Sequence, residues 1–197
     1  MKIGKKKLTT KEMTIVGIMV AITVIMDYTI GVIPLPMVSA TIVHIPAVIT
    51  GMVVGPFAGF IVGTAMGIES LIHAVTRPPS PLAPLFFNPI VSILPRMFIG
   101  VVAYYVYAGL KKALEKWKAG EPVSIFIGAA AGSLTNTVGV LAALYFVYAA
   151  QIEEILQTVT AKSFVVLVAT TNGLAEMIVS GIISVPVVMA LLKIKKS

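Results

Sequence analysis

Long apolar segments with almost no charge are the feature that most restricts what this chain can fold into. Hydrophobic residues make up 58% of its 197 residues, and charged residues only 12%. A soluble domain normally carries about a quarter charged residues, which cover its surface. We therefore expect an integral membrane protein, in which each spanning helix needs about 20 apolar residues.

Proline, glycine and charged residues divide this apolar sequence into predicted membrane helices. Gly55 and Pro56 separate the second helix from the third, because proline cannot continue an α-helix. The second helix is short, so it must tilt or lie sheltered between its neighbours. The prediction is a single all-α membrane domain over residues 1–197. Its six spans are expected at residues 12–30, 43–55, 57–74, 89–110, 123–150 and 163–192.

The basic residues indicate the orientation of the chain. Lysine-rich segments precede the first predicted span, separate the fourth from the fifth, and follow the sixth. These segments share one side only if an even number of spans lies between them, and the positive-inside rule then places both termini in the cytoplasm. Arg77 and Lys162 are the only basic residues in the loops on the opposite side. A signal peptide is not expected, because the V-S-A tripeptide at 38–40 lies too far beyond the first apolar run.

The composition also argues against several function classes. The chain has no cysteine, which excludes disulfides and thiolate metal sites. Its lysines flank apolar runs and do not form a basic face with interleaved aromatic residues, so nucleic acid is not an expected partner. The chain has no phosphate-binding glycine loop, and its few histidines and acidic residues are scattered. We therefore expect neither enzymatic activity nor a bound cofactor or metal.

The few polar residues within the predicted spans are candidate ligand contacts, because ionisable groups are costly in lipid. Arg96 would offer a fixed cation and a planar fork to a carboxylate or phosphate. It could instead form a buried ion pair with Glu176 or Glu69, and the sequence leaves both possibilities open. An outward-facing polar cup is predicted from Arg96, Asn88, His44, Asn136, Asn172, Glu69, Glu176 and Tyr148.

Most of these candidates also have a structural explanation. The asparagines of the fifth and sixth spans could link helices through hydrogen bonds. His44 could cap a helix. His73 lies four residues after Glu69 on the same helix face, and we interpret it as an interfacial residue or as the partner of that glutamate. Asp27 is assigned to the membrane interface.

Small residues at four-residue spacing predict close contacts between helices. Gly59, Gly63 and Gly67 follow this spacing in the third span, and we interpret them as a face that packs inside the protein. Gly17 and Ala21 form a similar pair in the first span, where they could contact another subunit.

The chain carries V-G-P-F-A-G at 54–59, G-I-E-S at 67–70, and F-N-P, L-P-R and G-V-V-A-Y-Y-V-Y between 87 and 107. With the basic N-terminus and the six predicted spans, these motifs resemble the substrate-binding S components of energy-coupling factor (ECF) vitamin transporters, over nearly the whole chain. T-I-V-H-I-P at 41–46 and the L-P-R segment resemble most the pantothenate-type S components.

The resemblance implies a subunit in the plasma membrane of a prokaryote that captures a vitamin on the outer face. It would then associate with a transmembrane coupling protein and two cytoplasmic ATPases, and ATP would be used by those partners. Gly17 and Ala21 match the positions at which S components usually carry Ala-x-x-x-Ala for docking the coupling protein. The proline-rich segments 34–40 and 78–89 would act as lids over the ligand.

The ligand that the resemblance favours is pantothenate, a carboxylate with hydroxyl and amide groups. Arg96, Asn88 and an asparagine of the fifth or sixth span would suit it. Riboflavin, folate, hydroxymethylpyrimidine and cobalamin are alternative ligands. An independent carrier driven by an ion gradient is the alternative function, with Asp27, Glu69 and Glu176 as proton sites. A structural subunit that binds no small molecule is a further possibility.

Overall fold

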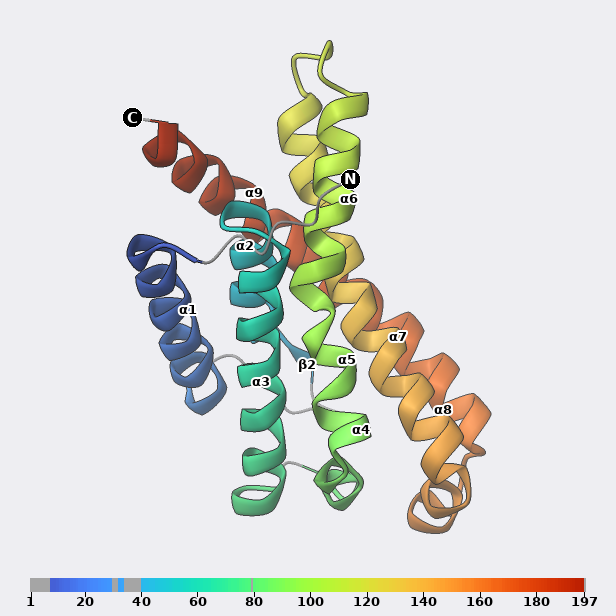
Figure 1. The fold of residues 1–197 in the computed structure, drawn as a ribbon. Coiled ribbons are helices and arrows are strands. Elements are labelled where there is room, and N and C mark those ends of the chain that lie inside the picture. Colours follow the sequence, from blue (N-terminus) through green and yellow to red (C-terminus); the bar gives the residue numbers. More distant parts are fainter. Residues whose placement is uncertain (1–7, 30–31, 34–39, 79, 197) are drawn as a thin grey trace, which may run out of the picture.

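The computed structural model describes residues 8–29, 32–33, 40–78 and 80–196, and these residues form a bundle of helices (Figure 1). The described α-helices are α1 Thr10–Tyr28, α2 Ile45–Val53, α3 Pro56–Thr76, α4 Pro89–Ser92, α5 Leu94–Met97, α6 Ile99–Ala113, α7 Gly120–Leu156, α8 Ala161–Val168 and α9 Leu174–Lys196. A 3-10 helix, η1 Ala83–Phe87, and a π-helical segment, η2 Ala169–Gly173, complete the helical elements. The short strands β1 Val32–Ile33 and β2 Ala40–Thr41 pair antiparallel.

Four helical stretches in the described part of the chain are long and apolar enough to cross a bilayer. They cover Pro56–Thr76, Pro89–Ala113, Gly120–Leu156 and Ala161–Lys195. Two of the six predicted spans do not meet this test. The first, α1, includes Lys11, Glu12 and Asp27. The second, α2, has nine residues and extends only about 14 Å, so the number of crossings stays a prediction.

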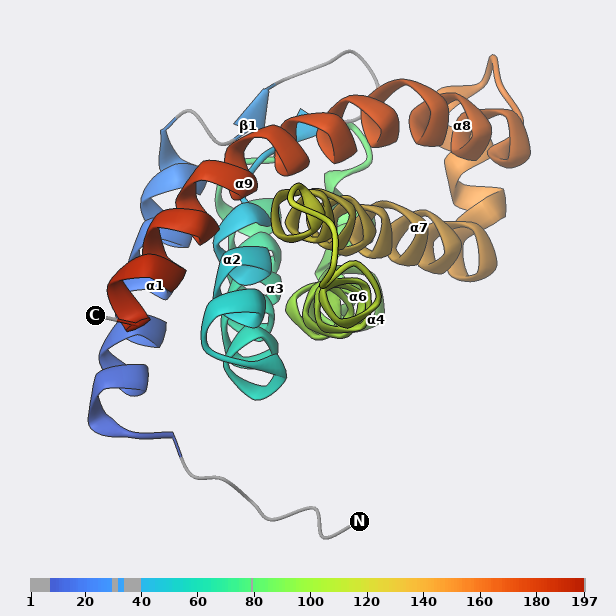
Figure 2. The same cartoon turned by 90° about the horizontal axis from the view of Figure 1, so that it is seen from above.

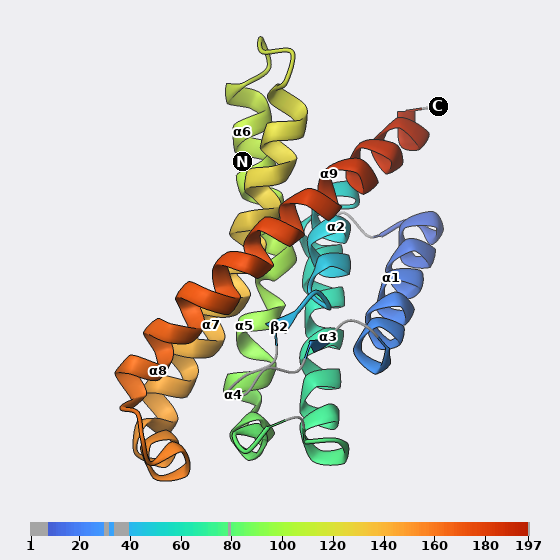
Figure 3. The same cartoon turned by 180° about the vertical axis from the view of Figure 1, so that it is seen from behind.

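The short helix α2 lies inside the bundle, where it needs no lipid-spanning length. All nine of its residues are buried. A helix surrounded by protein keeps its polar ends away from hydrocarbon, which is how short or broken helices are tolerated at membrane depth. Figure 3 shows α9 running diagonally past α2 and α7, on the opposite side from α3.

The two ends of the bundle differ in their connections. The start of α1, the α6–α7 turn and the end of α9 lie at one end, and the α3–η1 and α7–α8 connections lie at the other (Figure 1). The view from above places α1 at the edge of the bundle (Figure 2). Only Val16 and Thr23 of α1 are buried, so this helix is the most exposed of the long ones to its surroundings.

Glycines bring α2, α3 and α6 into backbone contact. A Cβ atom added at Gly51 would lie 2.1 Å from the carbonyl oxygen of Gly100, and one added at Gly59 would lie 2.9 Å from the Cα of Gly100. Further along α3, a Cβ at Gly63 would lie 2.2 Å from the carbonyl oxygen of Arg96. The glycine face of α3 therefore packs inside the protein, which confirms the interpretation of its four-residue spacing.

Gly100→Ala should destabilise the protein, because its new methyl group would meet Ala47 O and Gly59 Cα at 2.6 Å. Overpacking of this kind costs about 1–3 kcal/mol. Gly109→Ala on the same helix is the matched control, since nothing lies within 4 Å of its added Cβ. Thermal unfolding of the purified proteins in one detergent compares the two. Equal melting temperatures for both variants would contradict the close contact.

Candidate ligand-binding site

A cavity of about 140 Å³ lies among α1, α3, α5, α7 and α9, with η1 and η2 contributing to its wall. Because one water needs about 10–15 Å³ on this scale, the cavity has room for a small organic molecule and not only for an ion. Its wall is apolar where α7 contributes Val140, Leu141 and Leu144. The polar and charged lining residues are Asp27, Thr41, Ser70, His73, Ser80, Arg96, Asn136, Thr137, Asn172 and Glu176.

Arg96 reaches the cavity from a break in the membrane helix. Pro95 has no N–H, so the carbonyl of Val91 lacks the donor that a continuous helix would supply. The Nη1 atom of Arg96 donates to that carbonyl at 3.3 Å and to the carbonyl of Ser92 at 2.6 Å. The break between α4 and α5 and the position of the guanidinium therefore depend on each other.

The other edge of the Arg96 guanidinium has no hydrogen-bond partner among the described residues, although the group lies 5.8 Å from the centroid of the Phe86 ring. Its Nε is buried without a hydrogen bond, and Nη2 donates to no described residue. The ion pairs in the described part of the chain do not include Arg96, so the predicted alternative of a pair with Glu176 or Glu69 is not present there. A guanidinium carries five N–H donors, and the Nε–Nη2 edge matches the two oxygens of a carboxylate.

Glu176 connects three parts of the cavity wall. Its Oε1 accepts a hydrogen bond from the backbone N–H of Thr41 at 2.6 Å, and its Oε2 accepts one from the hydroxyl of Thr137 at 3.4 Å. These bonds join α9 to β2 and to α7. Because the glutamate is only 7% exposed, its role in this structure is to hold the wall together.

The two asparagines of the predicted site also line the cavity. Asn136 is 5% exposed, and its Oδ1 has no hydrogen-bond partner among the described residues. Asn172 lies in the π-helical segment η2, where its Oδ1 accepts from the hydroxyl of Thr171 at 3.1 Å. π-Helical segments occur frequently at functional sites. Each asparagine brings an amide group to the cavity wall.

Four predicted site residues do not line this cavity. Asn88 caps α4 by accepting from the N–H of Ile90 at 2.9 Å, and it donates to the hydroxyl of Tyr148 at 3.2 Å. Tyr148 lies at a kink inside α7. His44 is fully buried before α2 and not at an open mouth. Glu69 is buried, with no hydrogen bond to either carboxylate oxygen from the described residues.

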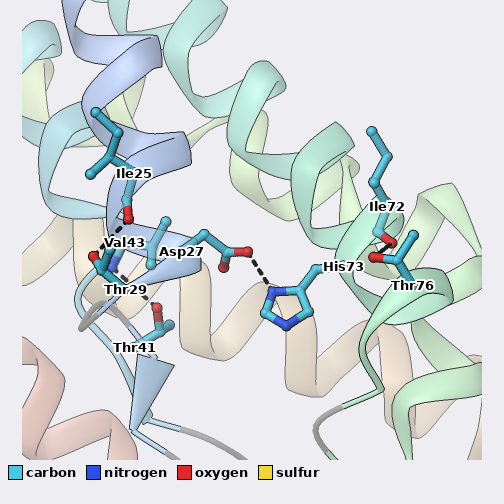
Figure 4. Close-up of polar contacts among 8 residues, drawn as sticks. All are labelled: Ile25, Asp27, Thr29, Thr41, Val43, Ile72, His73 and Thr76. Atoms are coloured by element: carbon cyan, nitrogen blue, oxygen red, sulfur yellow. Dashed lines mark hydrogen bonds and ion pairs between the residues drawn. The ribbon is translucent and has the colours of Figure 1, made fainter.

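Two cavity residues have partners that the sequence did not predict. The Nδ1 of His73 contacts the Oδ2 of Asp27, which joins α3 to α1 (Figure 4). His73 is therefore paired with Asp27 and not with Glu69. The two residues are 46 positions apart in the chain and lie on different helices, so spacing within one helix cannot reveal the pair. Among the described residues, His, Asp and Glu form no group of three that could hold a metal ion.

The family model for the substrate-specific component of ECF transporters matches residues 11–188. This range includes every residue that lines the cavity. The chain belongs to this S-component family. Its members are transport subunits of the prokaryotic plasma membrane that bind small vitamins and work with an ECF module.

The S component is also similar along its full length to a curated relative. The pantothenic acid transporter PanT of Lactococcus lactis subsp. cremoris (strain MG1363) is 28% identical over 209 residues. The aligned region covers 98% of this chain and 99% of the relative.

Glu176→Ala should destabilise the ligand-free protein, because it removes the acceptor for the partly buried N–H of Thr41. The expected loss is about 1–3 kcal/mol. Glu176→Gln should lose less, since its amide oxygen can accept the same bond. Glu154→Ala, at an exposed position of α7, is the control and should change little. Chemical unfolding of all three variants measures the difference, and equal stability of the Ala and Gln variants at 176 would contradict this role.

Proposed function

We propose that this S component captures pantothenate in the cavity and delivers it to the cell interior with an ATP-driven ECF module. The observation that carries the proposal is the buried Arg96, whose Nε–Nη2 edge has no hydrogen-bond partner among the described residues. The full-length similarity to the pantothenic acid transporter PanT supports the same ligand.

A ligand carboxylate would complete the environment of Arg96. A buried charge is costly unless it is paired and hydrogen-bonded. Two parallel N–H···O bonds from the free guanidinium edge would satisfy one carboxylate group and would fix its orientation. Riboflavin and hydroxymethylpyrimidine carry no carboxylate, so either would leave this edge without an anion.

The remaining groups of pantothenate also suit the cavity wall. Its amide and hydroxyl groups would hydrogen-bond to Asn136 and Asn172, which bring amides to the wall. Its two methyl groups would lie against the apolar residues Val140, Leu141 and Leu144 of α7. Pockets for small molecules typically combine such apolar walls with a few directed polar groups.

In this proposal the cavity lies toward the outer face, and both termini are cytoplasmic. The lysines of the α6–α7 turn and of the end of α9 lie at the end where α1 begins (Figure 1). This arrangement suits six crossings with the basic residues inside, provided that α1 and the sheltered α2 each cross. Lys2, Lys5, Lys6 and Lys7 lie outside the described residues, as do residues 34–39 of the first proposed lid.

The proposed docking face for the coupling protein is the Gly17–Ala21 face of α1. Both residues are exposed, and a Cβ added at Gly17 would meet nothing within 4 Å. Small residues at this spacing allow a second helix to approach closely. This face is therefore open in the isolated chain.

Arg96→Ala should weaken pantothenate binding at least tenfold, which corresponds to about 1.4 kcal/mol, because it removes the charged partner of the carboxylate. Isothermal titration of the purified chain measures the affinity. Lys162→Ala is the control, because Lys162 is an exposed cation that does not line the cavity. Pantothenol, in which an alcohol replaces the carboxylate, should bind the unmodified chain and Arg96→Ala equally weakly. Unchanged pantothenate affinity in folded Arg96→Ala would refute this contact.

Gly17→Leu combined with Ala21→Leu should abolish co-purification with the coupling protein and leave pantothenate affinity unchanged. The added side chains block only the exposed Gly17–Ala21 face of α1, which does not line the cavity. Gly109→Leu with Ala113→Leu is the matched control, since this pair has the same residues, spacing and exposure on α6. Intact co-purification of the α1 variant would remove this face from the proposal.

Uptake by whole cells separates the coupled subunit from an independent carrier. Cells that express this chain without the ATPases should not accumulate pantothenate. Accumulation in such cells would support a carrier driven by an ion gradient instead.

A further inference from the structure

We propose that His73 is a second ligand-binding residue, which accepts a hydrogen bond at Nε2 from a hydroxyl group of the ligand. Asp27 is its positioning residue. This inference rests on the proposed function, because it names the part of the ligand that the cavity recognises in addition to the carboxylate. Its basis is the geometry of the Asp27–His73 pair in the cavity wall.

The pair joins two helices at the cavity. Asp27 is near the end of α1 and His73 is near the end of α3, and both line the cavity. Their side chains are 10% and 17% exposed, respectively. Figure 4 shows the imidazole between the two helices, with Nδ1 directed at the carboxylate and the second ring nitrogen turned away from it.

The carboxylate determines what the other ring nitrogen can do. An ionised carboxylate only accepts hydrogen bonds, so Nδ1 carries the proton and donates it to Asp27. In the neutral ring, Nε2 then has a free lone pair and is an acceptor. A carboxylate that fixes a histidine in this way also fixes the direction of the second nitrogen.

The Nε2 atom is available to a ligand. It makes no hydrogen bond to a described residue, and it is not among the buried polar atoms that lack a partner. The atom therefore keeps some exposed surface, and the side chain that carries it lines the cavity. A hydroxyl group of a bound molecule can therefore donate to it.

A second contact holds the ring in place. The ring of Tyr28 stacks on that of His73 with centroids 6.2 Å apart and an angle of 19° between the planes. The guanidinium of Arg77 lies 4.5 Å from the centroid of Tyr28. Asp27 and Tyr28 therefore fix the imidazole along its edge and over its face. Binding then orders no additional side chain at this point, which favours affinity.

The cavity thus has two polar anchors of different chemistry. Arg96 on α5 offers a cation with a free donor edge, and His73 on α3 offers an Nε2 atom that accepts a hydrogen bond when the ring is neutral. A ligand that satisfies both has a carboxylate and a separate hydroxyl group. The chemical class that this pair selects is a hydroxylated monocarboxylic acid, and a carboxylic acid without the hydroxyl should bind poorly.

The test compares pantothenate with two analogues, each of which has one hydroxyl replaced by hydrogen. The full-length chain should bind at least one analogue tenfold or more weakly than pantothenate, because a site built to accept a hydroxyl rejects a ligand without it. His73→Phe should bind pantothenate and that analogue with equal affinity. His73→Gln should restore part of the preference, because its amide oxygen can accept the bond.

Two further variants separate the roles of the anchors. Asp27→Ala should reduce the hydroxyl preference, and Asp27→Asn should retain more of it, because the amide oxygen still accepts from Nδ1. Arg96→Lys should weaken pantothenate binding and keep the hydroxyl preference. These results would distinguish ligand recognition from a role of the Asp27–His73 pair in holding α1 in place, which would change melting temperature without changing the preference.

The outcomes for the two proposals differ. Absence of pantothenate binding by the unmodified chain would refute the proposed function. Equal affinity for pantothenate and for both analogues would overturn the hydroxyl contact alone. A full preference retained in His73→Phe, or in His73→Gln and Asp27→Ala if the Phe variant does not fold, would also overturn it.

Discussion

The structure around the cavity depends on the hydrogen bonds between the Arg96 guanidinium and the carbonyls of a broken helix. A continuous helix would leave no carbonyl for this side chain, and a broken helix without the arginine would bury an unpaired carbonyl in a membrane protein. Gly63 is part of the same arrangement, because any side chain there would collide with the carbonyl oxygen of Arg96. The absence of that side chain lets α3 lie against α5. His73 follows on α3 at the cavity wall, so the proline, arginine and glycine together place both proposed anchors.

The first helix relates the cavity to the surroundings of the protein. One face of α1 carries Val16 and Thr23, its buried residues, and Asp27 extends this face to the cavity. Another face carries Gly17 and Ala21, which are exposed. Because α1 is a single uninterrupted helix, a change at Asp27 on ligand binding would move a rigid body that also carries the proposed docking face. The Asp27–His73 contact thus lies between the ligand and the coupling protein in the proposed function.

Sequence reasoning predicts part of the cavity lining for a general physical reason. Arg96, Asn136, Asn172 and Glu176 are rare polar groups at membrane depth, and the structure places all four at one cavity. Their mutual contacts are not predictable in the same way. Glu176 bonds to a backbone N–H in β2, and His73 pairs with a residue on α1, so both contacts depend on helix rotations that no local pattern records. The prediction for Asn88 differs from the structure for a local reason. A polar residue at the start of a span resembles a ligand contact in the sequence, but here it caps α4 and does not line the cavity.

The state of the Arg96 guanidinium also constrains the charge of the ligand. Its Nη1 is already occupied by two backbone carbonyls, so one edge remains for an anion. The nearby carboxylates do not occupy this edge. Glu176 accepts hydrogen bonds from Thr41 and Thr137, and Asp27 is paired with His73. A ligand with two carboxylates, such as folate, would bring a second negative charge to a wall that already contains two acidic groups. A single carboxylate would satisfy the free edge without that repulsion. The same broken helix that positions the arginine therefore favours a monoanionic ligand.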